Sequence, residues 1–254
     1  MRTFLLLTVC GLLTPILGAA EELPKPTAHE TRNIEGWTVL VDQRLLEPAD
    51  EALGKRSLML LQGHLQRIND VVAPDRLEKL HAVTIQLDLN HGAMKVMQYH
   101  PSKDWLVNNG YSADLAKRVH ISDAARFADV RHQHIQPWCV LHELAHSYHD
   151  QVLGFEEPRV KSVWEKYKAS GHGDSVLHVD GHMRRHYALT NQMEFFAEMS
   201  ECYFGTNDFF PFVHSELKQA EPEVYALLRD VWGTPAWEKP EKSKPQEPKA
   251  AQNP

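Results

Sequence analysis

The chain has 254 residues, of which 27 are basic and 34 acidic, and its formal net charge is −7. No cluster of basic residues is dense enough to predict binding to nucleic acid. Beyond the first twenty residues, no apolar run approaches the length of a membrane-spanning helix. The sequence therefore predicts a mature protein without a membrane span, and it does not indicate an oligomeric state.

The N-terminus resembles a secretory signal peptide. A basic residue near the start is followed by an apolar stretch and by small residues at positions 18–20, which allow cleavage after Ala20. An uncleaved membrane anchor is the alternative, but the apolar stretch is short and is interrupted by Thr14 and Pro15. We therefore expect an exported protein, either secreted or periplasmic.

The rest of the chain divides by composition. Residues 21–35 are expected to form a simple leader, with a short inhibitory pro-segment as the alternative. Residues 36–234 have the size of one domain or of two lobes sharing a cleft, an α/β lobe at about 36–153 and a helical lobe at about 154–234. Residues 235–254 are rich in Pro, Lys and Glu, which predicts a disordered tail.

Apolar spacing predicts a small sheet with helices in the first half of the chain. We expect a strand at 38–41, a helix at 50–72 and a strand at 83–89. A turn and two further strands follow, at 90–92, 94–99 and 118–122. An exposed sheet edge can bind an extended peptide, and residues 94–100 or 118–122 are candidates for that edge.

The second half is predicted to be mostly helical. The expected helices lie at 135–153, 157–169, 191–204, 211–219 and 222–232. A small mixed or antiparallel sheet followed by helices indicates the α+β class.

The most informative motif is His-Glu-Leu-Ala-His at residues 142–146. On a helix, His142 and His146 project from the same face and can reach one metal ion, with Glu143 near the open side of that ion. The apolar flanks predict a buried helix, where two imidazoles and a carboxylate are costly without a partner. An amphipathic helix that happens to carry two histidines is the alternative. The spacing favours catalytic zinc.

A third metal ligand is expected from the segment at 191–198. Glu194 and Glu198 are four residues apart in a run rich in Phe, Met and Ala, which predicts a largely buried helix. Two ordinary surface glutamates are the alternative. Because the histidine motif still lacks a third ligand, we favour one inward-facing glutamate, but the spacing does not choose between the two.

The two segments together resemble the catalytic domain of anthrax lethal factor-type metallopeptidases, mainly over residues 134–205. These are zincins in which a tyrosine, six residues, the ligand glutamate and Phe-Phe-Ala-Glu follow in order. The resemblance implies that Glu194 is the third ligand and Tyr187 the catalytic tyrosine, with Glu198 behind the ligands. It also implies a zincin-like fold and hydrolysis of peptide bonds.

These residues predict a hydrolytic mechanism with one Zn²⁺ ion. Zinc lowers the pKa of a bound water to near 7, and Glu143 is expected to take the proton and pass it to the leaving amine. Zinc and the Tyr187 hydroxyl are expected to stabilise the oxyanion. Candidates for orienting the zinc-bound imidazoles are Asp150, Asn191 and Glu198.

Two other functions stay open. The chain can be a noncatalytic binding module stabilised by zinc, although such a site needs neither Glu143 nor Tyr187. It can also be a zinc hydrolase of a non-peptide amide.

Other histidines and the cysteines are less informative. Cys139 and Cys202 either pair across the two motif helices or lie separately as small buried residues. His178, His182 and His186 are expected on a loop or short hairpin, where His186 can reach substrate and a second metal site is disfavoured.

Overall fold

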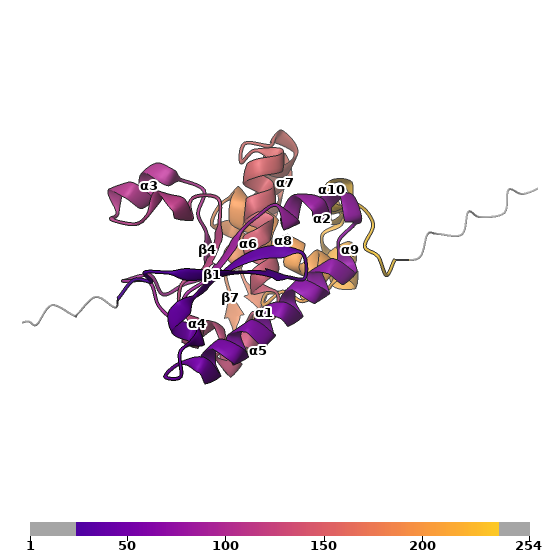
Figure 1. Cartoon of the computed structure of the whole chain (residues 1–254). Coiled ribbons are helices and arrows are strands. Elements are labelled where there is room, and N and C mark those ends of the chain that lie inside the picture. Colours follow the sequence, from indigo (N-terminus) through magenta and orange to yellow (C-terminus); the bar gives the residue numbers. More distant parts are fainter. Residues whose placement is uncertain (1–23, 239–254) are drawn as a thin grey trace, which may run out of the picture.

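The computed structural model describes residues 24–238, which form a mixed sheet packed with helices (Figure 1). The predicted signal peptide and most of the predicted tail lie outside these residues. The class is α+β, as predicted, with a small mixed sheet and a second half made mostly of helices.

The main sheet has five strands in the order β1-β2-β3-β5-β4. Their bounds are β1 His29–Ile34, β2 Trp37–Asp42, β3 Ile85–Leu87, β4 Gln98–Tyr99 and β5 Val119–Ile121. Strands β2, β3 and β5 run parallel, whereas β1 and β4 pair antiparallel at the two edges. The strands expected at 38–41, 83–89 and 118–122 are therefore present.

Two expectations about the sheet are wrong. Strand β1 lies within the segment expected to be a leader, and it pairs along its whole length with β2. Its outward side chains include Glu30 and Arg32, which form an ion pair of 2.7 Å. Residues 118–122 are not an edge, because β5 lies between β3 and β4. The edge beside the metal motif is β4.

The longer helices occur close to where their spacing predicts them. They are α1 Glu51–Val71, α6 Cys139–Tyr148, α7 Pro158–Ser170, α8 Gln192–Phe204, α9 His214–Ala220 and α10 Pro222–Trp232. Shorter elements that the spacing did not predict are α2 Pro74–His81, α3 Lys103–Asn108, α4 Ala124–Phe127, η1 Gln43–Leu46 and η2 Ala113–Leu115.

The helix expected at 135–153 is present as two consecutive elements, and a separate short helix precedes them. Helix α5, Val130–Ile135, ends before Pro137, whose ring disfavours helical backbone at the preceding residue. Helix α6 follows and continues into a π-helical turn, η3 His149–Leu153. Gly154 ends the turn with a positive φ of 83°. The predicted stop at Gly154 is confirmed, and the predicted start is wrong.

Helices α6 and α8 lie side by side at the centre of the molecule (Figure 1). All residues of α8 from Phe195 to Phe204 are buried, so its polar side chains must find partners inside the protein. Helix α6 also packs against strands β4 and β5. The metal motif is thus held between a buried helix and one edge of the sheet.

Candidate metal centre

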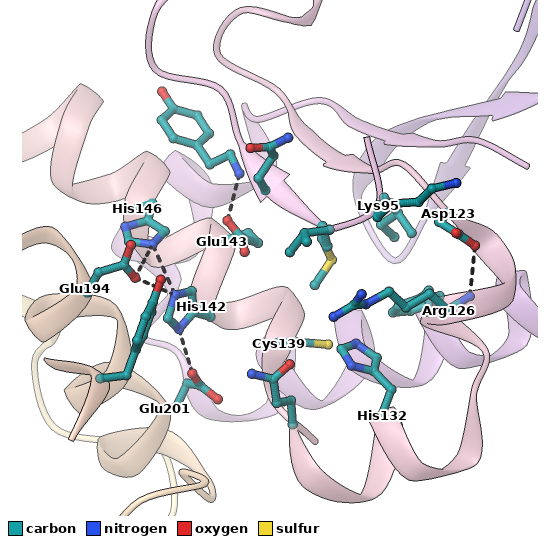
Figure 2. Close-up of a pocket in the computed structure, with 18 of the residues that line it drawn as sticks. Lys95, Asp123, Arg126, His132, Cys139, His142, Glu143, His146, Glu194 and Glu201 are labelled. Carbon is teal, nitrogen blue, oxygen red and sulfur yellow. Dashed lines mark hydrogen bonds and ion pairs between the residues drawn. The ribbon is translucent and has the colours of Figure 1, made fainter. Parts of the chain in front are cut away.

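Three side chains of the predicted metal site converge from two helices. The Nε2 atoms of His142 and His146 on α6 are 3.1 Å apart. The Oε2 atom of Glu194 on α8 lies 3.2 Å from the first nitrogen and 3.3 Å from the second. The three ligand atoms predicted from sequence therefore form a nearly equilateral triangle (Figure 2).

This triangle fits a tetrahedral metal ion. Ligand bonds of about 2.0–2.1 Å place the ligand atoms of a tetrahedral site about 3.3 Å from one another. The observed separations match that spacing, and the two nitrogens and one oxygen leave a fourth corner open toward the cleft. The group can therefore hold a metal ion with one free position.

Local backbone structure explains how Glu194 reaches the histidines. The side chain of Asn191 caps α8 and accepts hydrogen bonds from the backbone N–H groups of Met193 and Glu194, both at 2.9 Å. The cap starts α8 at Gln192, so Glu194 lies in the first turn of this helix, which faces α6. Asn191 therefore positions the helix, because its side chain bonds to the backbone of α8 rather than to either imidazole.

Glu201 orients His142, and the sequence analysis missed this residue. Its Oε1 atom accepts a hydrogen bond of 2.7 Å from Nδ1 of His142. The expected candidate, Glu198, lies farther away, with 3.7 Å between its Oε1 and the same nitrogen. Glu194, Glu198 and Glu201 are spaced by four and then three residues, so they share one face of α8. That spacing was the available signal for Glu201.

Asp150, another expected partner of the imidazoles, points elsewhere. Its Oδ2 atom accepts a hydrogen bond of 2.6 Å from the Tyr99 hydroxyl and pairs with Lys117. Asp150 therefore links η3 to the sheet edge.

Charges at the centre shift the pKa values of its groups. Burial opposes protonation of His142, but Glu194 and Glu201 outweigh it and raise the pKa of His142 well above its usual range. Burial also raises the pKa of Glu194, but the two imidazoles outweigh burial and hold this pKa well below its usual range. Burial raises the pKa of Glu201 to about 7, against the effect of His142. Metal binding requires His142 to give up its Nε2 proton.

Glu143 lies beside the triangle and is held by the sheet edge. Its Oε2 atom accepts a hydrogen bond of 2.7 Å from the backbone N–H of Tyr99 in β4 (Figure 2). Burial raises the pKa of Glu143, partly offset by the nearby imidazoles. A carboxylate with a raised pKa beside a metal site is suited to take up and release a proton.

A cavity of about 390 Å³ opens in front of the triangle. Its lining includes the three candidate ligands, Glu143 and Tyr187, and it extends along residues 95–99 toward α4 and α5. Tyr187 lies in the turn η4, Tyr187–Leu189, and is 47% exposed, so its hydroxyl is free to meet a ligand. All five predicted site residues therefore line one cleft.

Several secondary candidates do not join this site. His186 is buried and caps η4 through its Nδ1 atom, so it is not exposed to the cleft. It follows a hairpin formed by β6 Val176–Leu177 and β7 Met183–Arg184, in agreement with the predicted hairpin. Cys139 and Cys202 are both buried and free, so the disulfide alternative is not realised.

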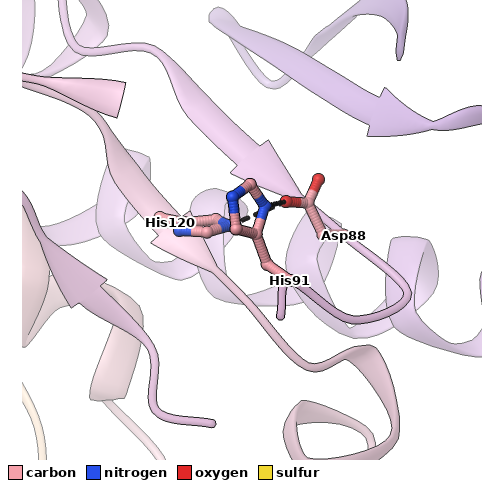
Figure 3. A group of neighbouring side chains, drawn as sticks. All are labelled: Asp88, His91 and His120. Carbon is pink, nitrogen blue, oxygen red and sulfur yellow. Dashed lines mark hydrogen bonds and ion pairs between the residues drawn. The ribbon is translucent and has the colours of Figure 1, made fainter. Parts of the chain in front are cut away.

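A second group of buried ligand-type side chains surrounds Asp88 (Figure 3). His29 contacts Oδ1 of Asp88 at 2.7 Å, while Gln86, His91 and His120 contact Oδ2 at 2.9, 2.7 and 2.8 Å. A carboxylate offers about four acceptor positions, and here one contact falls on Oδ1 and three crowd around Oδ2. The contacts are shorter than the spacing of about 3.3 Å between tetrahedral metal ligands. The side chains around Asp88 therefore form a hydrogen-bond network that joins β1, β3 and β5.

Among residues 24–238, one further group can hold a metal, formed by His142, Glu198 and Glu201. It shares His142 with the triangle and places both glutamates on the far side of the imidazole, so it competes for the same residue. His178, His182 and His186 form no such group in this part of the chain.

Comparison of the chain with protein families, with curated proteins and with solved structures finds no match. No helix in residues 24–238 is long and apolar enough to cross a membrane.

Replacing Glu201 should weaken the metal centre. Glu201→Ala removes the acceptor that fixes the ring of His142, and loss of such a partner typically lowers metal affinity 10–100-fold. Asp150→Ala is the matched control, because Asp150 contacts Tyr99 and Lys117 and neither imidazole. Competition with a chromophoric chelator, with Zn²⁺ as the probe ion, measures both affinities. Equal affinities for the two variants would contradict the role of Glu201.

Replacing Asp88 should destabilise the whole fold. Burial raises the pKa of Asp88, but hydrogen bonds from His120, His29 and His91 outweigh it and hold this pKa well below its usual range. Breaking such a buried network by Asp88→Asn should lower the free energy of unfolding by about 3 kcal/mol at about pH 7. Urea denaturation followed by circular dichroism measures the change.

The difference in the free energy of unfolding between wild type and Asp88→Asn should depend on pH. Because the pKa of folded Asp88 is below its unfolded value of about 3.9, its stabilising effect is present above about pH 4 and is lost as the pH falls. The gap between wild type and Asp88→Asn should thus shrink at about pH 3.5. Glu30→Gln, on an exposed ion pair, should change stability little at either pH. A gap that does not depend on pH would be inconsistent with this account.

Proposed function

We propose that the chain is a zinc-dependent metallopeptidase of the zincin type. One observation carries the proposal: three ligand atoms on two helices form a triangle of metal-site dimensions, with Glu143 beside its open corner. Two imidazoles, one carboxylate and an open fourth position are the ligand set of catalytic zinc. The resemblance of residues 134–205 to lethal factor-type peptidases supports the same choice.

The roles of the residues follow from their places in the cleft. A zinc ion held by His142, His146 and Glu194 would supply a hydroxide at neutral pH and would polarise a carbonyl. Glu143 takes the proton from the attacking water and delivers it to the leaving nitrogen. The N–H of Tyr99 fixes one oxygen of Glu143, so the other oxygen is free for this transfer. The Tyr187 hydroxyl donates a hydrogen bond to the oxyanion as it forms.

The sheet edge offers a binding site for an extended peptide. Val96 and His100 turn backbone groups toward β5, where the carbonyl of Val96 accepts from Ser122 and the N–H of His100 donates to Arg118. Gln98 likewise pairs with His120 of β5, whereas the alternate residues Met97 and Tyr99 turn their backbone groups toward the cleft. The peptide group of Met97 makes no hydrogen bond within residues 24–238. It is free to pair with the backbone of a substrate.

A diverse peptide mixture tests the function. Cleavage by the purified mature chain that is lost with a zinc chelator and regained with Zn²⁺ supports the proposal. Intact peptides in the presence of one bound zinc per chain would contradict it. That result would favour the two alternatives, a noncatalytic zinc-stabilised module or a hydrolase of non-peptide amides.

Changing Glu143 should separate catalysis from metal binding. Glu143→Gln should keep zinc bound while turnover falls by on the order of 10²–10⁴, because the amide cannot accept the proton. Glu194→Ala is the matched comparison, since it should lose both activity and zinc. Metal analysis after dialysis and the rate of peptide cleavage give the two readouts. Normal turnover by Glu143→Gln would refute the role of Glu143, and retained zinc in Glu194→Ala would move the metal site to the group of His142, Glu198 and Glu201.

Changing Tyr187 tests stabilisation of the oxyanion alone. Tyr187→Phe keeps the ring and removes the hydroxyl, so kcat should fall by roughly 10²-fold while zinc content is unchanged. Steady-state kinetics with a cleaved peptide, alongside metal analysis, measure both. Undiminished kcat would remove Tyr187 from the mechanism.

A further inference from the structure

Charge is distributed unevenly along the cleft. The glutamates of its lining gather at the metal end, on α6 and α8, where they are Glu143, Glu194, Glu198 and Glu201. The lysine and arginine of the lining, Lys95 and Arg126, both lie at the opposite end, on either side of Asp123, and the Arg126 side chain points toward His132 (Figure 2). These three basic side chains come from three separate segments: the approach to β4, α4 and α5. A molecule that lies along the cleft therefore meets a metal site at one end and cationic groups at the other.

Within the described residues, the charged groups of Lys95 and Arg126 are not paired with other side chains. Both side chains are exposed, and within residues 24–238 neither forms an ion pair or a side-chain hydrogen bond. The nearest carboxylate of the lining, Asp123, is engaged as the cap of α4, where it accepts from the backbone N–H of Arg126 at 3.0 Å. Asp129 caps α5 in the same way. Lys95 and Arg126 are therefore available to an anionic group that enters the cleft.

The direction of the edge strand indicates which side of the scissile bond lies near Lys95 and Arg126. The chain runs from Lys95 to Tyr99, and Tyr99 contacts Glu143. Antiparallel pairing is the commoner arrangement of strands. A peptide paired antiparallel with this edge runs from the metal end toward Lys95, so its residues near Lys95 follow the cleaved bond. At about 3.3 Å per residue, those side chains lie within about four residues of that bond.

We propose that Lys95 and Arg126 bind a carboxylate of the substrate on the C-terminal side of the scissile bond. This inference rests on the proposed peptidase function and adds its substrate class. The carboxylate belongs either to an acidic side chain or to the free C-terminus of the peptide. Both present the same group to the cleft, and the experiment distinguishes them.

The test uses the zinc-loaded full chain and internally quenched peptides built on a sequence found to be cleaved. One series carries Glu or Gln at each of the first four positions after the cleaved bond, with an amidated C-terminus. A second series has neutral side chains and ends in either a carboxylate or an amide. We expect kcat/KM to be about fivefold higher for the acidic member at one position of one series, as two exposed ion pairs allow.

Variants assign the preference to the two cations. The double variant Lys95→Ala/Arg126→Ala should bring the ratio of the paired peptides close to one while neutral peptides are cleaved as before. Lys55→Ala is the control, because Lys55 is an exposed cation on α1 that pairs with Glu51 away from the cleft. It should keep the wild-type ratio.

Two results would overturn the inference alone. They are equal cleavage of acidic and neutral peptides by the wild type, and a preference that survives in the double variant. Absence of cleavage for every peptide, with zinc bound, would instead overturn the proposed function and the inference with it.

Discussion

The site depends on the position of His142 between two carboxylates of one buried helix. Its Nε2 atom faces Glu194 and its Nδ1 atom faces Glu201, seven residues farther along α8. Such a double contact fixes both the rotation of the ring and the relative position of α6 and α8. Because α8 is buried along nearly its whole length, it has little freedom to adjust. The rest of the centre, including His146, is placed by this alignment.

A second link joins the metal centre to the sheet. Glu143 lies next to His142 in the chain but is held by the backbone of β4, and Tyr99 of the same strand also contacts Asp150 beyond α6. Tyr99 in the edge strand thus contacts both α6, through Glu143, and η3, through Asp150. In the proposed function, the group for proton transfer and the edge for peptide binding therefore meet at Tyr99, which would place a bound peptide next to Glu143.

Much of this arrangement could be predicted from the sequence, for reasons visible in particular residues. The ligand triangle follows from spacing within helices, since His142 and His146 are one turn apart, and the third ligand was named from the resemblance. Long helices such as α1 and α10 have strong apolar periodicity and clear ends. Spacing fails where a structure depends on contacts distant in sequence. The contact of His29 with Asp88 spans 59 residues, so neither the network nor the place of β1 in the sheet was visible. The π-helical turn after α6 likewise has no marker except Gly154.

The two edge strands of the main sheet, β1 and β4, differ in how readily a further strand can pair with them. Strand β1 displays Glu30 and Arg32 along its outer side, and charged side chains on a border discourage pairing with a neighbouring molecule. Strand β4 is only two residues long, and both of its residues line the cleft. Charged side chains thus disfavour strand pairing at β1, whereas β4 is the edge at which we propose that one peptide chain binds. Under the proposed function, a folded globular protein would have to expose an extended segment before it could bind at β4.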